Sequence, residues 1–118
     1  MKKITESENY EISFDYEKVP LMLKQTGKTI LIGEFYGDPC AAIISKKEDF
    51  CVIGGEGIII YYLNEPFFDY NGVEKTGQWK TWGRDNLNKI VWVDKIEQID
   101  DNTIKVTSEN NEEFLLTI

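Results

Sequence analysis

At 118 residues and 13.7 kDa, the chain is long enough for one hydrophobic core but too short for two, so residues 1–118 are expected to form a single domain. The formal net charge is −8, and Arg84 is the only arginine. Because nucleic-acid binding depends on positive charge, and because arginine is the usual group for phosphates and base edges, this balance argues against a nucleic-acid ligand.

The sequence contains no histidine, and this restricts its chemistry. Ser-His-Asp and Cys-His nucleophilic machinery is excluded, together with the commonest general base and the favoured ligand for zinc. The two cysteines are too few for a zinc site, and Gly54–Gly57 matches neither a phosphate loop nor a dinucleotide fingerprint. Paired carboxylates could still carry out glycoside chemistry, but 21 acidic residues guarantee many accidental pairs, so this signal has almost no specificity. We therefore expect no catalytic residues, no cofactor and no metal, and hence a protein that is not an enzyme.

No apolar run approaches the roughly 20 residues of a membrane span, and no apolar segment follows Lys2 and Lys3 as it would in a secretory signal. These features predict a cytoplasmic protein with no membrane partner.

In chain order, Tyr10–Tyr16 alternates cleanly between apolar and polar residues. This pattern predicts a half-buried strand near a sheet edge, with one inward face formed by Tyr10, Ile12, Phe14 and Tyr16. The next segment, Glu17–Gln25, holds the only plausible helical turn, with Pro20 at a first helical position. Thr29–Tyr36 is a further strand, in which Gly33 indicates a bulge or a close approach by another backbone.

Cys40–Leu63 is the stretch around which the rest of the chain is organised. Its three apolar runs are separated by turn signals at Lys46–Asp49 and Gly54–Gly57. Because Ile58–Leu63 offers apolar groups to both sides, we expect an antiparallel meander covered on both faces.

A four-residue loop at Lys46–Asp49 pairs Ile44 with Cys51. Cys40 then lies four residues from the partner of Cys51, which is roughly 13 Å at about 3.4 Å per residue. A disulfide needs Cα atoms within about 7 Å, so this register predicts two free thiols.

After Asn64–Pro66 the chain changes in character. Asn71-Gly72 is a strong hairpin signal between Phe67–Tyr70 and the returning segment Val73–Gly83. Trp79 and Trp82 are three apart, so they should point to opposite faces of a strand.

The last third predicts a second meander with turns at Asp94, Asp100–Asn102 and Glu109–Glu112. Its strands are expected at Asn88–Val93, Lys95–Ile99, Thr103–Thr107 and Glu113–Ile118. With Asn110-Asn111 as the turn centre, Val106 should pair with Leu115 and Ile104 with Thr117.

Turn signals recur every eight to twelve residues or so, which is typical of an all-β sandwich or barrel. We expect an antiparallel fold of about 8 to 10 short strands with at most one short helix. The expected buried positions are Ile43, Val52, Ile60, Val91 and Val106.

The predicted hairpin is also the candidate binding site, since aromatic rings ringed by charge are enriched at interface hot spots. We interpret Phe67 and Trp79 as core, and Tyr70 and Trp82 as interface. The full set of candidate partner-binding residues is Phe68, Asp69, Tyr70, Glu74, Trp79, Trp82, Arg84 and Asp85.

A short, acidic, all-β chain that lacks catalytic residues and ends in VWVDKIEQIDDNTIKVTSENNEEFLLTI resembles bacterial toxin-immunity proteins, such as those of contact-dependent growth inhibition systems. The resemblance concerns whole-chain character and assigns no residues. It implies a protein that binds and occludes a basic toxin domain, expected to be a nuclease. The alternative is a non-catalytic β-domain that binds carbohydrate or another small ligand on an aromatic platform of Trp79, Trp82 and Tyr70.

Overall fold

The computed structural model describes residues 2–72, 77–84 and 90–118. In these residues the chain forms antiparallel strands and no helix, so the all-β class is confirmed, with eleven strands in place of eight to ten. The strands are β1 (Lys2–Glu6), β2 (Tyr10–Phe14), β3 (Lys18–Leu23), β4 (Thr29–Glu34), β5 (Ala41–Ile44), β6 (Phe50–Gly55), β7 (Gly57–Tyr62), β8 (Trp79–Trp82), β9 (Val93–Asp100), β10 (Thr103–Ser108) and β11 (Glu113–Thr117). The described part therefore holds no helix that is long and apolar enough to cross a membrane.

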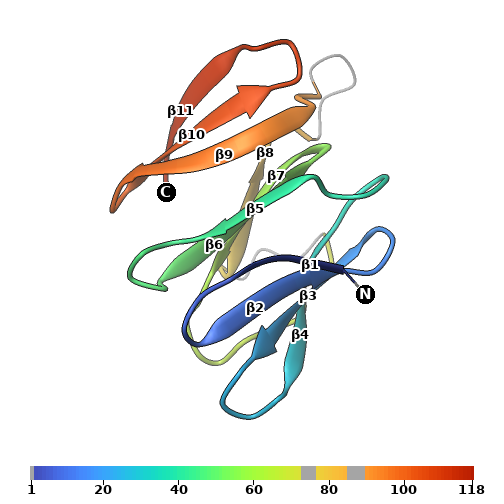
Figure 1. The fold of residues 1–118 in the computed structure, drawn as a ribbon, viewed down its shortest axis with the longest axis vertical. Helices are drawn as coiled ribbons and strands as arrows, with labels where there is room; N and C mark the ends of the chain where they lie inside the picture. Colours follow the sequence, from blue (N-terminus) through green and yellow to red (C-terminus); the bar gives the residue numbers. More distant parts are fainter. Residues whose placement is uncertain (1, 73–76, 85–89) are drawn as a thin grey trace.

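The strands form three sheets, each a meander of consecutive strands: β1-β2-β3-β4, β5-β6-β7-β8 and β9-β10-β11. Figure 1 shows the three sheets stacked along the long axis, with β5–β8 between the other two. The stack measures 40 × 28 × 28 Å. The fold is therefore a sandwich with one more layer than the usual two.

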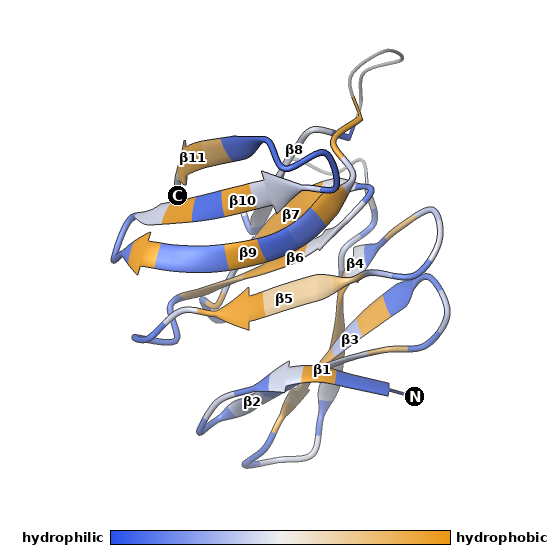
Figure 2. Ribbon diagram, turned by 45° about the horizontal axis from the view of Figure 1, so that its top comes forward, coloured by the Kyte–Doolittle hydropathy of each residue, from blue (hydrophilic) through white to orange (hydrophobic). Residues whose placement is uncertain are grey.

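The middle sheet is buried on both faces, as the sequence predicts. One face of β6 and β7, with Ile53, Ile59 and Tyr61, packs into a first core with side chains of β2–β4. The other face, with Val52, Ile58 and Ile60, packs into a second core with side chains of β9 and β10. Figure 2 shows how the middle sheet differs from the third sheet in hydropathy. Strand β5 is hydrophobic along its length, whereas β10 alternates between hydrophobic and hydrophilic residues.

The predicted register of the central hairpin is confirmed, because Ile44 pairs with Cys51. Cys40 and Cys51 are both free thiols. The glycine-rich segment is a tight turn that pairs Gly55 with Gly57, and Gly57 has a φ of 70°. At this φ a residue with a side chain would be strained, which accounts for glycine at the position.

The predicted helical turn in Glu17–Gln25 is wrong, because Lys18–Leu23 is strand β3. Pro20 is tolerated there because the β3–β4 ladder shifts register between Val19 and Pro20, and bulges admit proline in a sheet. The shift skips Ile32 on β4, next to Gly33, so the bulge predicted near Gly33 is confirmed.

The first predicted strand is β2, which lies beside the edge strand β1 (Lys2–Glu6) and so is near the sheet edge, as expected. The expectation for Tyr16 is wrong, because it does not continue the inward face of β2. It lies in the β2–β3 turn with a φ of 58°, and it is 83% exposed.

Two expectations for the last third are also wrong. Val93–Asp100 is one continuous strand, so the chain does not turn at Asp94. Val106 pairs with Phe114, which is one residue out of the predicted register. The cause is a three-residue loop in which Asn111, at a φ of 66°, closes the turn, a common alternative to a two-residue turn. As a result Leu115 points outward.

Of the five expected core residues, Val52, Ile60 and Val106 are fully buried. Ile43 and Val91 are only half-buried, because β5 is an edge strand and Val91 precedes β9.

Candidate functional site

The predicted aromatic hairpin is not formed, because Phe67–Tyr70 contributes no strand. This segment instead covers the free edge of β4. The Tyr70 amide donates to the Leu31 carbonyl at 2.8 Å, and the Leu31 amide donates to Asp69 Oδ1 at 2.9 Å. Tyr70 is consequently buried, and its assignment to an exposed interface is wrong. Phe68 is exposed, but its carbonyl accepts the Tyr61 hydroxyl within the fold.

Trp79 and Trp82 do point to opposite faces of β8. Trp79 packs in the first core, where its ring stacks 6.3 Å from Tyr61 and lies 5.2 Å from Tyr70. Trp82 packs in the second core with its ring 4.9 Å from that of Phe114. A platform of Trp79, Trp82 and Tyr70 is therefore not present.

Arg84 lies just after β8. Its side chain contacts residues of both the first sheet and the middle sheet. Its Nη2 donates to the Glu34 carbonyl at 2.8 Å, and its guanidinium sits 4.5 Å from the centre of the Phe35 ring. A carboxylate oxygen of Glu56 is 3.9 Å away. Arg84 thus holds the fold together at this point. The remaining two candidates, Glu74 and Asp85, lie outside the described residues.

A different surface carries three of the exposed aromatic rings, those of Tyr16, Tyr36 and Trp92. Five connecting segments from all three sheets meet at one end of the stack, which we call the aromatic end. It consists of residues 15–17, 36–38, 56, 90–92 and 109–112. In Figure 1 the β2–β3 and β4–β5 connections lie side by side at the right-hand edge, and the β10–β11 connection lies at the right-hand end of the uppermost sheet.

Hydrogen bonds join these segments in sequence across the stack. The Phe35 amide donates to the Glu17 carbonyl at 2.9 Å, which ties β4 to the β2–β3 turn. The Tyr36 amide donates to Glu56 Oε1 at 3.2 Å, which ties the first sheet to the middle one. The Gly57 amide donates to the Val91 carbonyl at 2.7 Å, and the Glu109 amide donates to the Trp92 carbonyl at 2.8 Å. These two bonds connect the middle sheet to the third sheet through residues 91 and 92.

Three large rings project from this end. Tyr16 is 83% exposed, Tyr36 77% and Trp92 45%. Each comes from a different connection, and the contacts above hold their backbones in place. Scattered exposed apolar groups are ordinary on a protein surface, but three large aromatics on one set of interlocked loops form a candidate contact surface.

The aromatic end is predominantly acidic, although exposed Lys18 directly follows its first segment and Arg84 lies 3.9 Å from Glu56. Its segments contain no lysine or arginine, and their acidic residues are Asp15, Glu17, Asp38, Glu56, Glu109 and Glu112. Glu56 is partly committed to the Tyr36 amide and Glu17 Oε2 to the Gly37 amide. The other four carboxylates are exposed.

The opposite end of the stack has a different composition, and we call it the lysine end. It consists of residues 7–9, 24–28, 45–49, 63–67 and 101–102. It carries the four lysines Lys24, Lys28, Lys46 and Lys47 among its acidic residues. Its segments interlock largely through side chains. Glu48 accepts the Ser7 hydroxyl and the Asn9 amide, and Lys47 pairs with Asp101 at 2.8 Å.

Two features bear on catalysis and metal binding. Within the described part of the chain, no three Cys, Asp or Glu side chains gather where they could hold a metal ion. Beside Trp92 there is a small cavity of about 110 Å³, lined in part by Ser108 and Glu109. It is too small for most organic ligands, whose pockets start near about 300 Å³.

Sequence reasoning missed the aromatic end because its parts are far apart along the chain. A usable local signal was present at two of them. In Asp15-Tyr16-Glu17 and Tyr36-Gly37-Asp38 a tyrosine stands among turn-forming and charged residues. The first was interpreted as the end of an alternating strand. Trp92, within Val91-Trp92-Val93, carries no comparable signal.

Comparison with models of known protein families finds no match to this chain, and a search of curated proteins finds no match either.

Proposed function

We propose that this protein is an immunity protein that binds a basic toxin domain, most simply a nuclease, and blocks it by occlusion without catalysing a reaction. The observation that supports the proposal is the aromatic end, where Tyr16, Tyr36 and Trp92 project from a predominantly acidic set of loops. Tyrosine and tryptophan are the residues most enriched among interface hot spots.

The charge pattern fits a basic partner. A net charge of −8 steers a positively charged domain toward the protein, and the aromatic end concentrates negative charge where the rings are exposed. A nuclease must present positive charge around its cleft to hold phosphates. An acidic surface with projecting rings can enter such a cleft and displace the nucleic acid.

The geometry also favours a preorganised surface. The rings sit on turns whose backbones are joined to one another, so little loop ordering remains to be completed on binding. We expect a buried area of roughly 1,600 Å² in total, the standard size for specific complexes. The small-ligand alternative required Trp79, Trp82 and Tyr70 to form one exposed platform. It is less well supported, because Trp79 and Tyr70 pack in the first core.

Charge reversal tests the steering. Asp38→Lys and Glu109→Lys each raise the net charge by two at the aromatic end, and Glu8→Lys makes the same change at the lysine end. The side chains of Asp38 and Glu8 are exposed. We expect the two aromatic-end variants to associate several-fold more slowly with the partner, with a weaker dependence on salt, and the control to change little.

Protection tests the function itself. A basic toxin domain, sought first among the genes that flank this one, should kill cells that express it alone and spare cells that co-express the wild-type chain. The cells should die when the co-expressed chain combines Tyr36→Ala and Trp92→Ala. Equal killing with and without the wild-type chain would refute the proposal, and protection by the double variant would refute the assignment to the aromatic end.

A further inference from the structure

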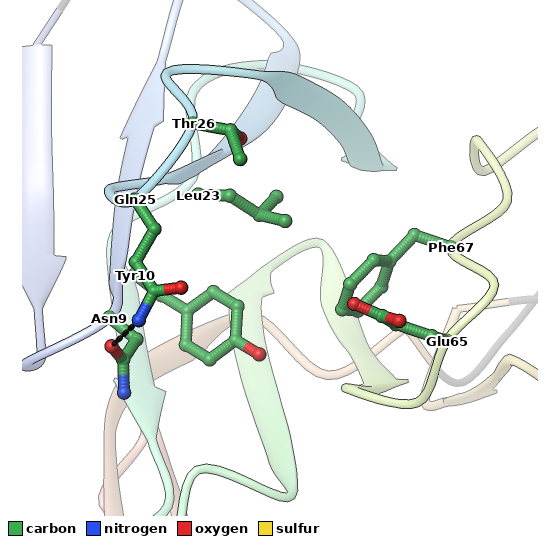
Figure 3. Close-up of a pocket in the computed structure, with 7 residues that line it drawn as sticks. All are labelled: Asn9, Tyr10, Leu23, Gln25, Thr26, Glu65 and Phe67. Carbon is green, nitrogen blue, oxygen red and sulfur yellow. Dashed lines mark hydrogen bonds between the residues drawn. The ribbon is translucent and has the colours of Figure 1, made fainter.

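A second candidate site lies at the lysine end, away from the aromatic rings. A cavity of about 300 Å³ opens between the β1–β2 turn, the β3–β4 turn and the chain that follows β7. Figure 3 shows Tyr10 and Leu23 on one side of it, and Glu65 and Phe67 on the other. Its volume is at the lower end of the range for small-molecule pockets. The described residues that line it are Asn9, Tyr10, Leu23, Gln25, Thr26, Glu65 and Phe67.

Two aromatic rings form the apolar part of the wall. The rings of Tyr10 and Phe67 are 6.4 Å apart and meet edge to face, at 78°. Both side chains are half-buried against the first core, so the rings are fixed by packing. Aromatic faces attract cations through the ring quadrupole, and the attraction grows as water is removed.

The polar groups that line the cavity include two acceptors, the Gln25 amide oxygen and the Glu65 carboxylate, beside the hydroxyls of Tyr10 and Thr26, which can donate or accept. The Gln25 amide nitrogen donates to Asn9 Oδ1 at 3.2 Å, which leaves the Gln25 amide oxygen turned toward the cavity (Figure 3). The Asn9 amide nitrogen is itself committed to Glu48 Oε1 at 2.7 Å. The Glu65 carboxylate stands at the opposite wall, so a ligand meets acceptors from two sides.

The local charge is negative although lysines are nearby. Among the described residues of the lining, Glu65 is the only charged one, and none is a lysine. Lys24 is held elsewhere, with its Nζ 2.6 Å from Glu6 Oε1 and 2.8 Å from the Ser7 carbonyl. Burial raises the pKa of Tyr10, and the nearby carboxylates of Glu48 and Glu65 raise it further.

We infer that this cavity binds a small organic cation, whose ammonium or guanidinium group pairs with Glu65, donates to the Gln25 amide oxygen and rests against Tyr10 and Phe67. Acceptors and aromatic rings suit a donor-rich cation, whereas a carboxylate or phosphate ligand would be repelled by Glu65. The inference does not depend on the proposed function, because the cavity lies at the other end of the stack from the aromatic end.

The test is an NMR titration with n-butylammonium chloride, and with n-butanol as a neutral probe of similar shape. We expect saturable shifts of the Tyr10 and Gln25 signals with n-butylammonium, and much weaker ones with n-butanol. Glu65→Gln should weaken n-butylammonium binding by about tenfold, since it removes a charge-assisted hydrogen bond. Phe67→Leu keeps an apolar wall, and the loss of its ring should weaken binding by about threefold.

Glu8→Gln, which removes a carboxylate of the same end outside the lining, is the matched control and should leave the affinity unchanged. The inference is overturned if n-butylammonium does not bind, if n-butanol binds as tightly, or if Glu8→Gln weakens binding as much as Glu65→Gln.

Discussion

The two ends of the stack are built from the same kind of element but are joined in different ways. At the aromatic end, neighbouring connections meet through backbone pairs, such as the Gly57 amide with the Val91 carbonyl and the Glu109 amide with the Trp92 carbonyl, and through the carboxylates of Glu17 and Glu56, which accept from backbone amides. At the lysine end they meet mainly through side chains, with Glu48 bound to Ser7 and Asn9 and Lys47 paired with Asp101.

This difference has a functional consequence. Side chains that join loops to one another are not free for a partner, whereas backbone contacts leave side chains available. Tyr16, Tyr36 and Trp92 are exposed because the loops beneath them are held together without them. The aromatic end is therefore suited to macromolecular contact, and the lysine end presents a small cavity within its side-chain network.

Replacing one glycine with alanine at each end should give the largest difference in stability between the two ends. Gly57 and Gly27 have similar φ values, 70° and 75°. A Cβ on Gly57 would meet the backbone of Gly83, whereas a Cβ on Gly27 would meet nothing within 4 Å. We expect Gly57→Ala to cost about 3 kcal/mol or more, from backbone strain plus overpacking, and Gly27→Ala about 1 kcal/mol from strain alone. Urea unfolding measures both, and equal losses would show that the aromatic end is not tightly joined.

The next prediction concerns acid sensitivity at the lysine end. The Ser7 hydroxyl and then the Asn9 backbone amide hold the pKa of Glu48 below its usual value of 4.5. A carboxylate with a depressed folded-state pKa stabilises the protein above its unfolded-state pKa, and that stabilisation is lost as the pH falls through the folded-state pKa. Glu48→Gln should therefore cost about 1 kcal/mol near neutral pH, and less at about pH 3.5.

Urea unfolding of both proteins at the two pH values provides the measurement. A difference between wild type and Glu48→Gln that stays constant with pH would show that the ionised carboxylate contributes nothing to the joining of these loops.

The smallest expected effect on stability is at Tyr16, whose φ of 58° is unusual for a residue with a large side chain. Asparagine tolerates this conformation better, so Tyr16→Asn should leave stability unchanged or raise it by up to about 1 kcal/mol. It should nevertheless weaken partner binding, because the ring is lost. Tyr16→Phe keeps the ring and is the matched control. A clear loss of stability in Tyr16→Asn would indicate that the tyrosine serves the fold.

The sequence was sufficient for the middle sheet because its signals are local and redundant. The charged loop at Lys46–Asp49 determines its own register, and Ile58–Tyr62 is apolar on both faces. The errors arose at positions where tertiary contacts, and not the local sequence, determine the backbone conformation. Pro20 lies at a bulge that depends on β4, and the backbone of Tyr70 pairs with Leu31 although Asn71-Gly72 favours a hairpin. The one-residue slip at Val106 follows from the left-handed conformation of Asn111.

The candidate site was less predictable than the fold. Of the predicted residues, Trp79 and Trp82 were correctly assigned to opposite faces, but neither ring lies at the aromatic end. The aromatic end exists only because three sheets stack with their connections aligned. That alignment brings residue 16 to the same end as residue 92, and no local pattern in the sequence encodes it.

The claim that a partner binds at the aromatic end is tested most directly by the dissociation rate of the complex. Two double variants are compared: Tyr36→Ala with Trp92→Ala at the aromatic end, and Phe68→Ala with Leu115→Ala, which removes two exposed apolar side chains elsewhere. We predict dissociation at least about 30-fold faster for the first, equivalent to about 2 kcal/mol, and unchanged for the second. Unchanged dissociation of the first variant, or an equal acceleration of both, would contradict the claim.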